Sequence, residues 1–257
     1  LIQTVVLIFL VAGGSVICED EINPLDLIRK NNSIVDPDNK LDSINTVRMI
    51  MRTDNGNVEF LKNIKYWYKK PELRKLEIVS RKDFLIYSIT PDSTWFIDKR
   101  MNVNVPTVVN MNNKDNALFN CLNAHTNLFM CKIQFDSTNE TAQYIGIEEL
   151  DGKKVHKILI QVKDIFSHTI ITDKRMSFEK QYYYIDAVTN LIYCKEYYFA
   201  LKSVKTRIKE YMVVDDIVLP KEFVTSSDLY EEKRDTDVII DQVKFNTKID
   251  DRFFHSK

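Results

Sequence analysis

The sequence predicts a mainly β protein with a few helices (α+β), built on one strongly curved antiparallel sheet of about ten strands wrapped around the helices. Two observations carry this prediction. Apolar and polar residues alternate with a period of two in segment after segment, and short turn signals join these segments, as antiparallel pairing requires. Aromatic residues reach 11% and only 5 Gly are present, a composition typical of strands with large side chains.

A short helix is expected where the regular structure begins. Asn23 and Pro24 supply a capping residue and a first-turn proline, and Asp36-Pro37 ends the apolar pattern that follows. From Thr46 the alternation becomes that of a strand. Asp54-Asn55-Gly56 then signals a hairpin, because Asn and Gly accept positive φ.

The stretch from Ile64 to Ile89 predicts three strands, with a break at Pro71, which has no N–H to donate. Apolar and long charged side chains share both faces of these strands. The pattern therefore assigns neither face to the core, since a sheet that is wet on one side alternates more cleanly. Another hairpin is expected around Pro91-Asp92-Ser93.

Between Met101 and Phe135 this rhythm breaks. After a cap at Asp115, apolar residues recur at spacings of three and four, which predicts a helix. Its apolar stripe consists of Leu118, Cys121, Leu122, His125 and Phe129. The spacing alone favours an ordinary helix packed on the core.

The clearest hairpin joins Gln143–Leu150 to Val155–Val162 through the two-residue turn Asp151-Gly152. This register places Glu149 opposite Lys154. Further strands are expected at Gln181–Asp186, Leu191–Phe199, Arg207–Val214, Lys221–Leu229 and Val238–Asn246.

Composition and motifs exclude several classes of function. The 36 basic and 37 acidic residues nearly cancel, which argues against nucleic acid as a partner. The four histidines (His125, His156, His168 and His255) belong to no ligand set, and no nucleotide-binding loop or serine-hydrolase motif occurs. We therefore expect no metal, no cofactor and no enzymatic activity. A secreted enzyme whose titratable groups assemble only in space is the alternative.

The first residues have the pattern of an export signal. Val5 to Ile17 form an uncharged apolar run that ends in small residues and is followed by acidic ones. We expect residues 1–18 to be a signal peptide whose true start is missing, and 19–257 to be a single domain. Retention of the run as an anchor and lipidation of Cys18 are the alternatives.

Removal of that segment would leave three cysteines, Cys121, Cys131 and Cys194. A Cys121–Cys131 disulfide suits an oxidising compartment, and three small buried thiols fit the sequence as well.

Several stretches, taken in order, point to a known family. They are Trp67 to Pro71, Asp83 to Tyr87, Trp95-Phe96-Ile97, Tyr144 to Val155, Tyr183 to Asp186, Ile217 to Lys221 and Val243 to Phe254. The ordered set resembles the periplasmic lipoprotein carriers of the LolA/LolB type, especially the outer-membrane lipoprotein-sorting group. Asp216 stands where that group usually has Gly.

The resemblance implies an incomplete β-barrel (LolA-like) and a periplasmic carrier or chaperone that binds acyl chains of lipoproteins in an apolar cavity and helps sort them to the outer membrane. Acylated lipoproteins or lipids, an inner-membrane release complex and an outer-membrane acceptor would be its partners. The expected lipid-binding residues are Tyr66, Trp67, Tyr68, Leu76, Ile78, Trp95, Leu118, Leu122 and Phe129, the last three on a lid. A lipid- or lipoprotein-sensing or anchored domain of the same fold, without transport, is the alternative.

Lys70 precedes Pro71 where, by the same resemblance, the well-known carrier has an Arg that holds the lid shut. Lys70 is therefore the candidate lid latch. It would be a weaker one, because Arg offers a rigid fork of donors and Lys a single flexible ammonium. A solvated cation at the end of a strand is the alternative.

Overall fold

The computed structural model describes residues 22–53, 63–70, 73–79, 84–91, 93–99, 102–109, 131–163, 180–199, 202–227 and 234–255. Its helical elements are α1 (Pro24–Val35) and the 3-10 helices η1 (Lys40–Ser43) and η6 (Asp251–Phe254). The strands are β1 (Thr46–Thr53), β2 (Asn63–Lys69), β3 (Leu73–Val79), β4 (Phe84–Ile89), β5 (Thr94–Asp98), β6 (Val103–Val109), β7 (Glu140–Leu150), β8 (Lys153–Val162), β9 (Lys180–Asp186), β10 (Ile192–Phe199), β11 (Lys202–Val214), β12 (Ile217–Ser227) and β13 (Arg234–Phe245).

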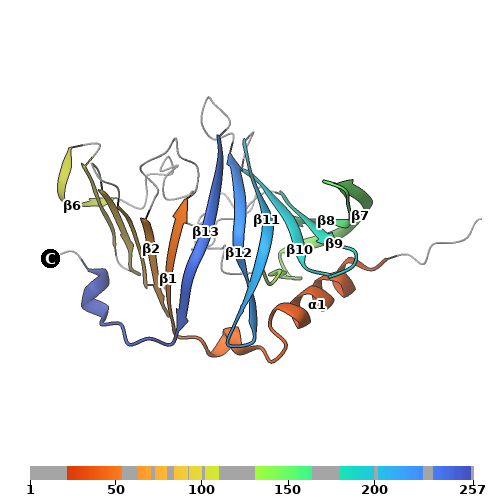
Figure 1. The fold of residues 1–257 in the computed structure, drawn as a ribbon, viewed down its shortest axis with the longest axis horizontal. Helices are drawn as coiled ribbons and strands as arrows, with labels where there is room; N and C mark the ends of the chain where they lie inside the picture. Colours follow the sequence, from red (N-terminus) through yellow and green to blue (C-terminus); the bar gives the residue numbers. More distant parts are fainter. Residues whose placement is uncertain are drawn as a thin grey trace, which may run out of the picture.

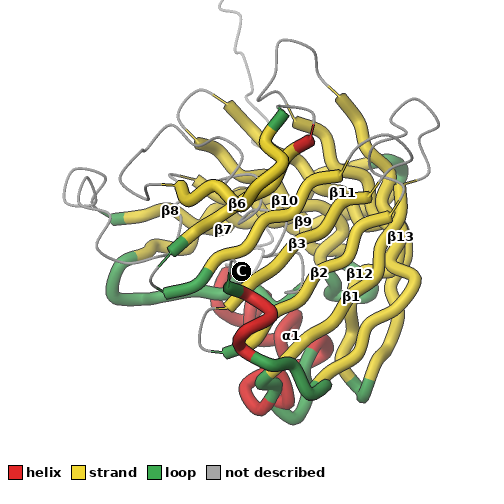
Figure 2. The backbone as a smooth tube through the Cα atoms, turned by 90° about the vertical axis from the view of Figure 1, so that its left-hand side faces the viewer, coloured by secondary structure: helices red, strands yellow, loops and turns green. Residues whose placement is uncertain are grey.

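These strands form one antiparallel sheet in the order β6-β5-β4-β3-β2-β1-β13-β12-β11-β10-β9-β8-β7. It consists of two meanders, β1 to β6 and β7 to β13, joined where β1 pairs with β13. Figure 1 shows the bent sheet with β6 and β7 on opposite sides of the molecule, and Figure 2 shows α1 at one end of the strands. The chain between β6 and β7 therefore connects the two edges of the sheet.

The sheet has 13 strands, more than the ten or so expected from the sequence. β6 is one of the additional strands. The sequence did not predict it, because it lies where the alternation breaks down and contains Pro106. Proline cannot donate to a ladder and is tolerated in strands mainly at a sheet edge. β6 is such an edge, so its proline does not prevent pairing with β5.

Two strong local signals were confirmed, and the Asp54-Asn55-Gly56 turn lies outside the described residues. α1 begins after Asn23, whose side chain accepts a hydrogen bond from the backbone N–H of Leu25 at 2.9 Å, and it ends before Asp36. In the β7–β8 hairpin Glu149 lies opposite Lys154, and Asp151 and Gly152 have φ of 52° and 76°. Two positive φ values match the right-handed twist of the flanking strands.

The β11–β12 turn shows how the chain accommodates Asp216, where the group that it resembles usually has Gly. Asp215 and Asp216 both have positive φ, at 51° and 66°. The Asp216 carboxylate pairs with Lys40 of η1 at 2.5 Å, and this contact holds the pKa of Asp216 below its ordinary value. The ion pair connects the turn to η1.

Candidate functional site

The face of the sheet that packs against α1, here called the inner face, carries a continuous apolar cluster. Leu27, Ile28 and Val35 of α1 belong to this cluster, together with residues from both meanders. One row of register partners crosses from β13 to β5 and consists of Val243, Met49, Tyr66, Leu76, Tyr87 and Phe96. Burial of each large apolar side chain contributes about 1.5–3 kcal/mol, and this face carries the largest apolar cluster among the described residues.

Four of the residues expected to bind lipid lie on the inner face. Tyr66, Leu76 and Ile78 are buried members of the cluster, and Tyr68 packs against it while partly exposed. β2 and β3 place them side by side, because Tyr66 pairs with Leu76 and Ile64 with Ile78.

Trp67 and Trp95 lie on the opposite, outer face. Side chains alternate along a strand, so Trp67 cannot share a face with Tyr66. Trp67 instead packs with Leu73 and Phe254, and the Trp95 indole N–H donates to the carbonyl of Phe254 at 2.8 Å. The structure thus separates the two tryptophans from the inner-face residues with which the sequence grouped them.

The C-terminal segment covers this part of the outer face. The rings of Phe253 and Trp67 meet edge to face with centroids 5.0 Å apart, and the Lys75 ammonium lies 3.8 Å from the Phe253 ring centroid. The carbonyl of Phe254 also accepts a hydrogen bond from the Ser88 hydroxyl at 2.6 Å. These contacts give Trp67 and Trp95 a structural role.

The expected lid residues Leu118, Leu122 and Phe129 lie outside the described residues. The segment that follows them, from Cys131 to β7, is described, and Cys131 and Ile133 are buried members of the inner-face cluster. Cys131 is a free thiol, and burial raises its pKa to about 12. The end of the β6–β7 connection is therefore anchored on the inner face.

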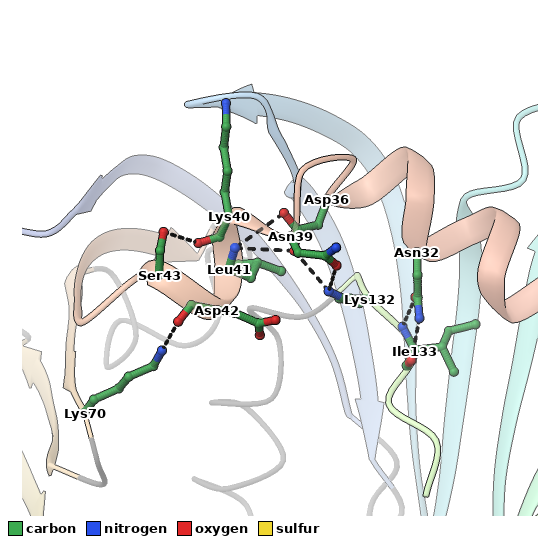
Figure 3. A network of polar contacts seen from close by, with 10 residues as sticks. All are labelled: Asn32, Asp36, Asn39, Lys40, Leu41, Asp42, Ser43, Lys70, Lys132 and Ile133. Atoms are coloured by element: carbon green, nitrogen blue, oxygen red, sulfur yellow. Dashed lines mark hydrogen bonds and ion pairs between the residues drawn. The ribbon is translucent and has the colours of Figure 1, made fainter. Parts of the chain in front are cut away.

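Polar contacts attach this segment to α1 (Figure 3). The Asn32 side chain donates to the carbonyl of Ile133 at 2.9 Å and accepts from its N–H at 2.7 Å. The Lys132 ammonium lies 3.0 Å from the buried carboxylate of Asp36 and donates to Asn39 at 3.1 Å. Asp36 also accepts from the N–H of Leu41, so one carboxylate joins α1, η1 and the start of the segment.

Lys70 belongs to the same region but contacts η1. Its ammonium donates to the carbonyl of Asp42 at 2.5 Å (Figure 3). Its backbone N–H donates to the carbonyl of Asn45 at 2.8 Å. The candidate latch therefore lies at the end of β2, next to η1. Asp36 links η1 to Lys132. Its role as a latch remains a prediction, since the lid residues are not described.

A polar group on the inner face, around Lys195 of β10, was not predicted from the sequence. Lys195 lies between Tyr183 of β9 and Thr206 of β11 in the register, and Tyr197 follows two residues later. A bulge between Ile192 and Cys194 reverses the alternation of β10. A strict period of two from buried Ile192 would point Lys195 outward, so the pattern held no signal for this side chain.

Among the described residues no group of histidine, cysteine and carboxylate side chains is arranged to hold a metal ion. Within the same residues, no helix is long and apolar enough to cross a membrane.

Comparison with solved structures identifies the fold. A LolA superfamily protein from Nitrosomonas europaea aligns with a TM-score of 0.52 at 11% identity over 91% of this chain and 98% of the other. A protein of a family of unknown function from Desulfovibrio piger aligns with a TM-score of 0.53 at 11% identity, also over 91% and 98% of the two chains. A putative outer membrane lipoprotein-sorting protein domain from Vibrio parahaemolyticus gives 0.47 at 13% identity over 88% and 97%.

Sequence comparison adds little to this. A family model described only as an uncharacterized protein matches residues 132–257, and no curated protein matches the chain. The two structural alignments with TM-scores above 0.5 span nearly the whole of both chains. The chain therefore has the fold of the LolA superfamily, as the resemblance predicted.

Proposed function

We propose that the protein is a periplasmic carrier that shields acyl chains of lipoproteins or lipids on the inner face of its sheet and helps sort them to the outer membrane. Residues 1–18 serve in this proposal as the export signal, and 19–257 as the single carrier domain. An inner-membrane release complex would load the carrier and an outer-membrane acceptor would unload it. The role is binding without catalysis.

The observation that carries the proposal is the inner-face cluster, which runs through both meanders of a LolA-like sheet. Ile185 and Ile192 of the second meander and Met49 and Tyr66 of the first belong to the same cluster. An acyl chain that reaches such a surface leaves water at a gain of about 0.8 kcal/mol per methylene. Several methylenes would offset a modest cost of opening the fold.

The test uses protein purified from its own cell envelope without detergent. We expect mass spectrometry to recover copurified acylated lipid, and the delipidated protein to bind a fluorescent fatty acid and transfer it to acceptor vesicles. Leu76 and Leu73 of β3 give a matched pair, because they are similarly buried on the inner and outer faces. Leu76→Ala should weaken binding about tenfold, and Leu73→Ala should leave it unchanged.

Absence of both copurified lipid and fatty-acid binding would refute the proposal. Binding without transfer would support the alternative of a sensing domain. Equal binding by the Leu76→Ala and Leu73→Ala variants would show that the inner face does not hold the chain.

Lys70 allows a separate test of ligand release. Lys70→Arg should slow release of a fluorescent fatty acid, since a guanidinium fork fixes the contact with η1 more firmly than one ammonium does. Lys70→Leu should retain bound ligand or stall its transfer, with little change in melting temperature. Stopped-flow release into vesicles measures both effects. Unchanged release in both variants would show that the contact of Lys70 with Asp42 is structural and does not act as a latch.

A further inference from the structure

Lys195 is a lysine inside the fold. Lys195 is 3% exposed. The bulge in β10 turns its side chain toward the inner-face cluster, which contains Ile158, Ile185 and Phe223. Burial of an ammonium costs several kcal/mol after relaxation, and buried charges in proteins are normally paired. Such a residue requires either a partner or a function.

The described residues supply no anion for Lys195. None of the ion pairs among them includes it, and its ammonium lies 5.4 Å from the ring centroid of Tyr197. Burial lowers the pKa of Lys195, and the groups whose negative form would counter this are Tyr183, Cys131 and Cys194. Burial raises the pKa of both thiols to about 12 and that of Tyr183 well above its ordinary value, so all three are neutral at pH 7.

Two hydroxyl-bearing residues flank Lys195 in the register. Thr206 lies beside Lys195 in the register, and its hydroxyl is 3.4 Å from that of Thr225 on β12. Tyr183 lies on the other side and donates to the Gln181 side chain at 2.9 Å. Glu140 acts electrostatically on Tyr183, but its carboxylate accepts from the N–H of Asp136 at 2.8 Å and forms none of the described ion pairs.

We propose that Lys195 binds the anionic head of an acyl-bearing amphiphile, whose chain lies against the adjacent apolar inner face. The proposal rests on the proposed function and specifies its ligand class as a monoanionic carboxylate or phosphodiester lipid. One cation with no anionic partner among the described residues matches one negative charge. The apolar residues next to it give the binding energy for a chain, which a free anion would lack.

The experiment compares charged and neutral ligands with the same chain. Delipidated full-length protein is titrated with palmitic acid against methyl palmitate, and with a lysophosphatidylglycerol against a monoacylglycerol, while acetate and inorganic phosphate serve as anions without chains. We expect the wild-type protein to prefer a charged ligand about 10- to 100-fold, as one charge-assisted contact allows. Lys195→Met should abolish that preference and keep affinity for the neutral ligand.

Lys205 provides the matched control. It lies on the next strand with its ammonium over the ring of Tyr184, which belongs to a cluster on the outer face. Lys205→Met should therefore leave the preference intact. Lys195→Gln and melting curves for all variants show whether any loss of binding comes from unfolding instead.

The outcomes separate the two proposals. If neither charged nor neutral ligand binds the wild-type protein, the proposed function fails. If both bind equally, or if the preference survives in folded Lys195→Met and Lys195→Gln variants, the role of Lys195 is overturned and the acyl-binding function stands. Binding of acetate or phosphate as tightly as the acyl ligands would overturn the assignment to an amphiphile.

Discussion

Phe254→Ala is expected to lower the free energy of unfolding by about 3–5 kcal/mol, the usual cost of removing a fully buried aromatic side chain. Phe254 is 0% exposed although it lies near the end of the chain, and it forms a cluster with Trp67 and Leu73. The substitution leaves a cavity between η6 and the outer face of β2 and β3. Urea denaturation measures the effect as a lower midpoint at an unchanged slope.

The two tryptophans make this region directly observable. Trp67 and Trp95 are the chain's only 2 Trp, and both contact the C-terminal segment. Their fluorescence should therefore report the segment's release, while far-UV circular dichroism reports the whole sheet. Arg252→Ala is the matched control, because this side chain is exposed and, among the described residues, pairs with Asp250 of its own turn. Phe254→Ala protein as stable as the wild type would show that the C-terminal segment does not contribute to the cooperative fold.

The parts of the fold that the sequence predicted depend on near neighbours in the chain. Asn23 caps its own helix, and Asp151-Gly152 sets the register of its own hairpin, so the cause of each feature can be read within a few residues. The pairing of β1 with β13 has no such local signal. It joins Val47 to Phe245, and only the packing of the complete sheet specifies it.

Part of the candidate site was predictable because its residues also follow a local pattern. Tyr66, Leu76 and Ile78 follow a regular alternation, and the structure places them on one face. Trp67 was grouped with them because both faces of β2 carry aromatic residues, and the covering segment that distinguishes the faces lies far along the chain. Lys195 could not be predicted, because a single extra residue in β10 reverses which side chains point inward.

Lys132→Met is expected to lower the free energy of unfolding by about 3–5 kcal/mol, because it leaves a buried carboxylate without its cation. The side chain of Asp36 is 0% exposed, and the Lys132 ammonium lies 3.0 Å from it. The remaining contacts of Asp36 to the N–H of Leu41 are long, at 3.3 and 3.4 Å, and cannot replace the ion pair. Thermal and urea unfolding followed by circular dichroism measure the loss.

A double-mutant cycle identifies the cause. Asp36→Asn combined with Lys132→Met removes both charges, so the double variant should be more stable than Lys132→Met alone. Lys40→Met is the control within the same network, since its pair with Asp216 is solvent-exposed and its loss should change stability little.

If the Lys132→Met and Lys40→Met variants are equally stable, the Asp36–Lys132 pair does not anchor the β6–β7 connection. If Lys132→Met alone unfolds early, the attachment of this connection to α1 and η1 is part of the core. The Asp36–Lys132 pair would then fix the segment from Lys132 onward to α1 and η1.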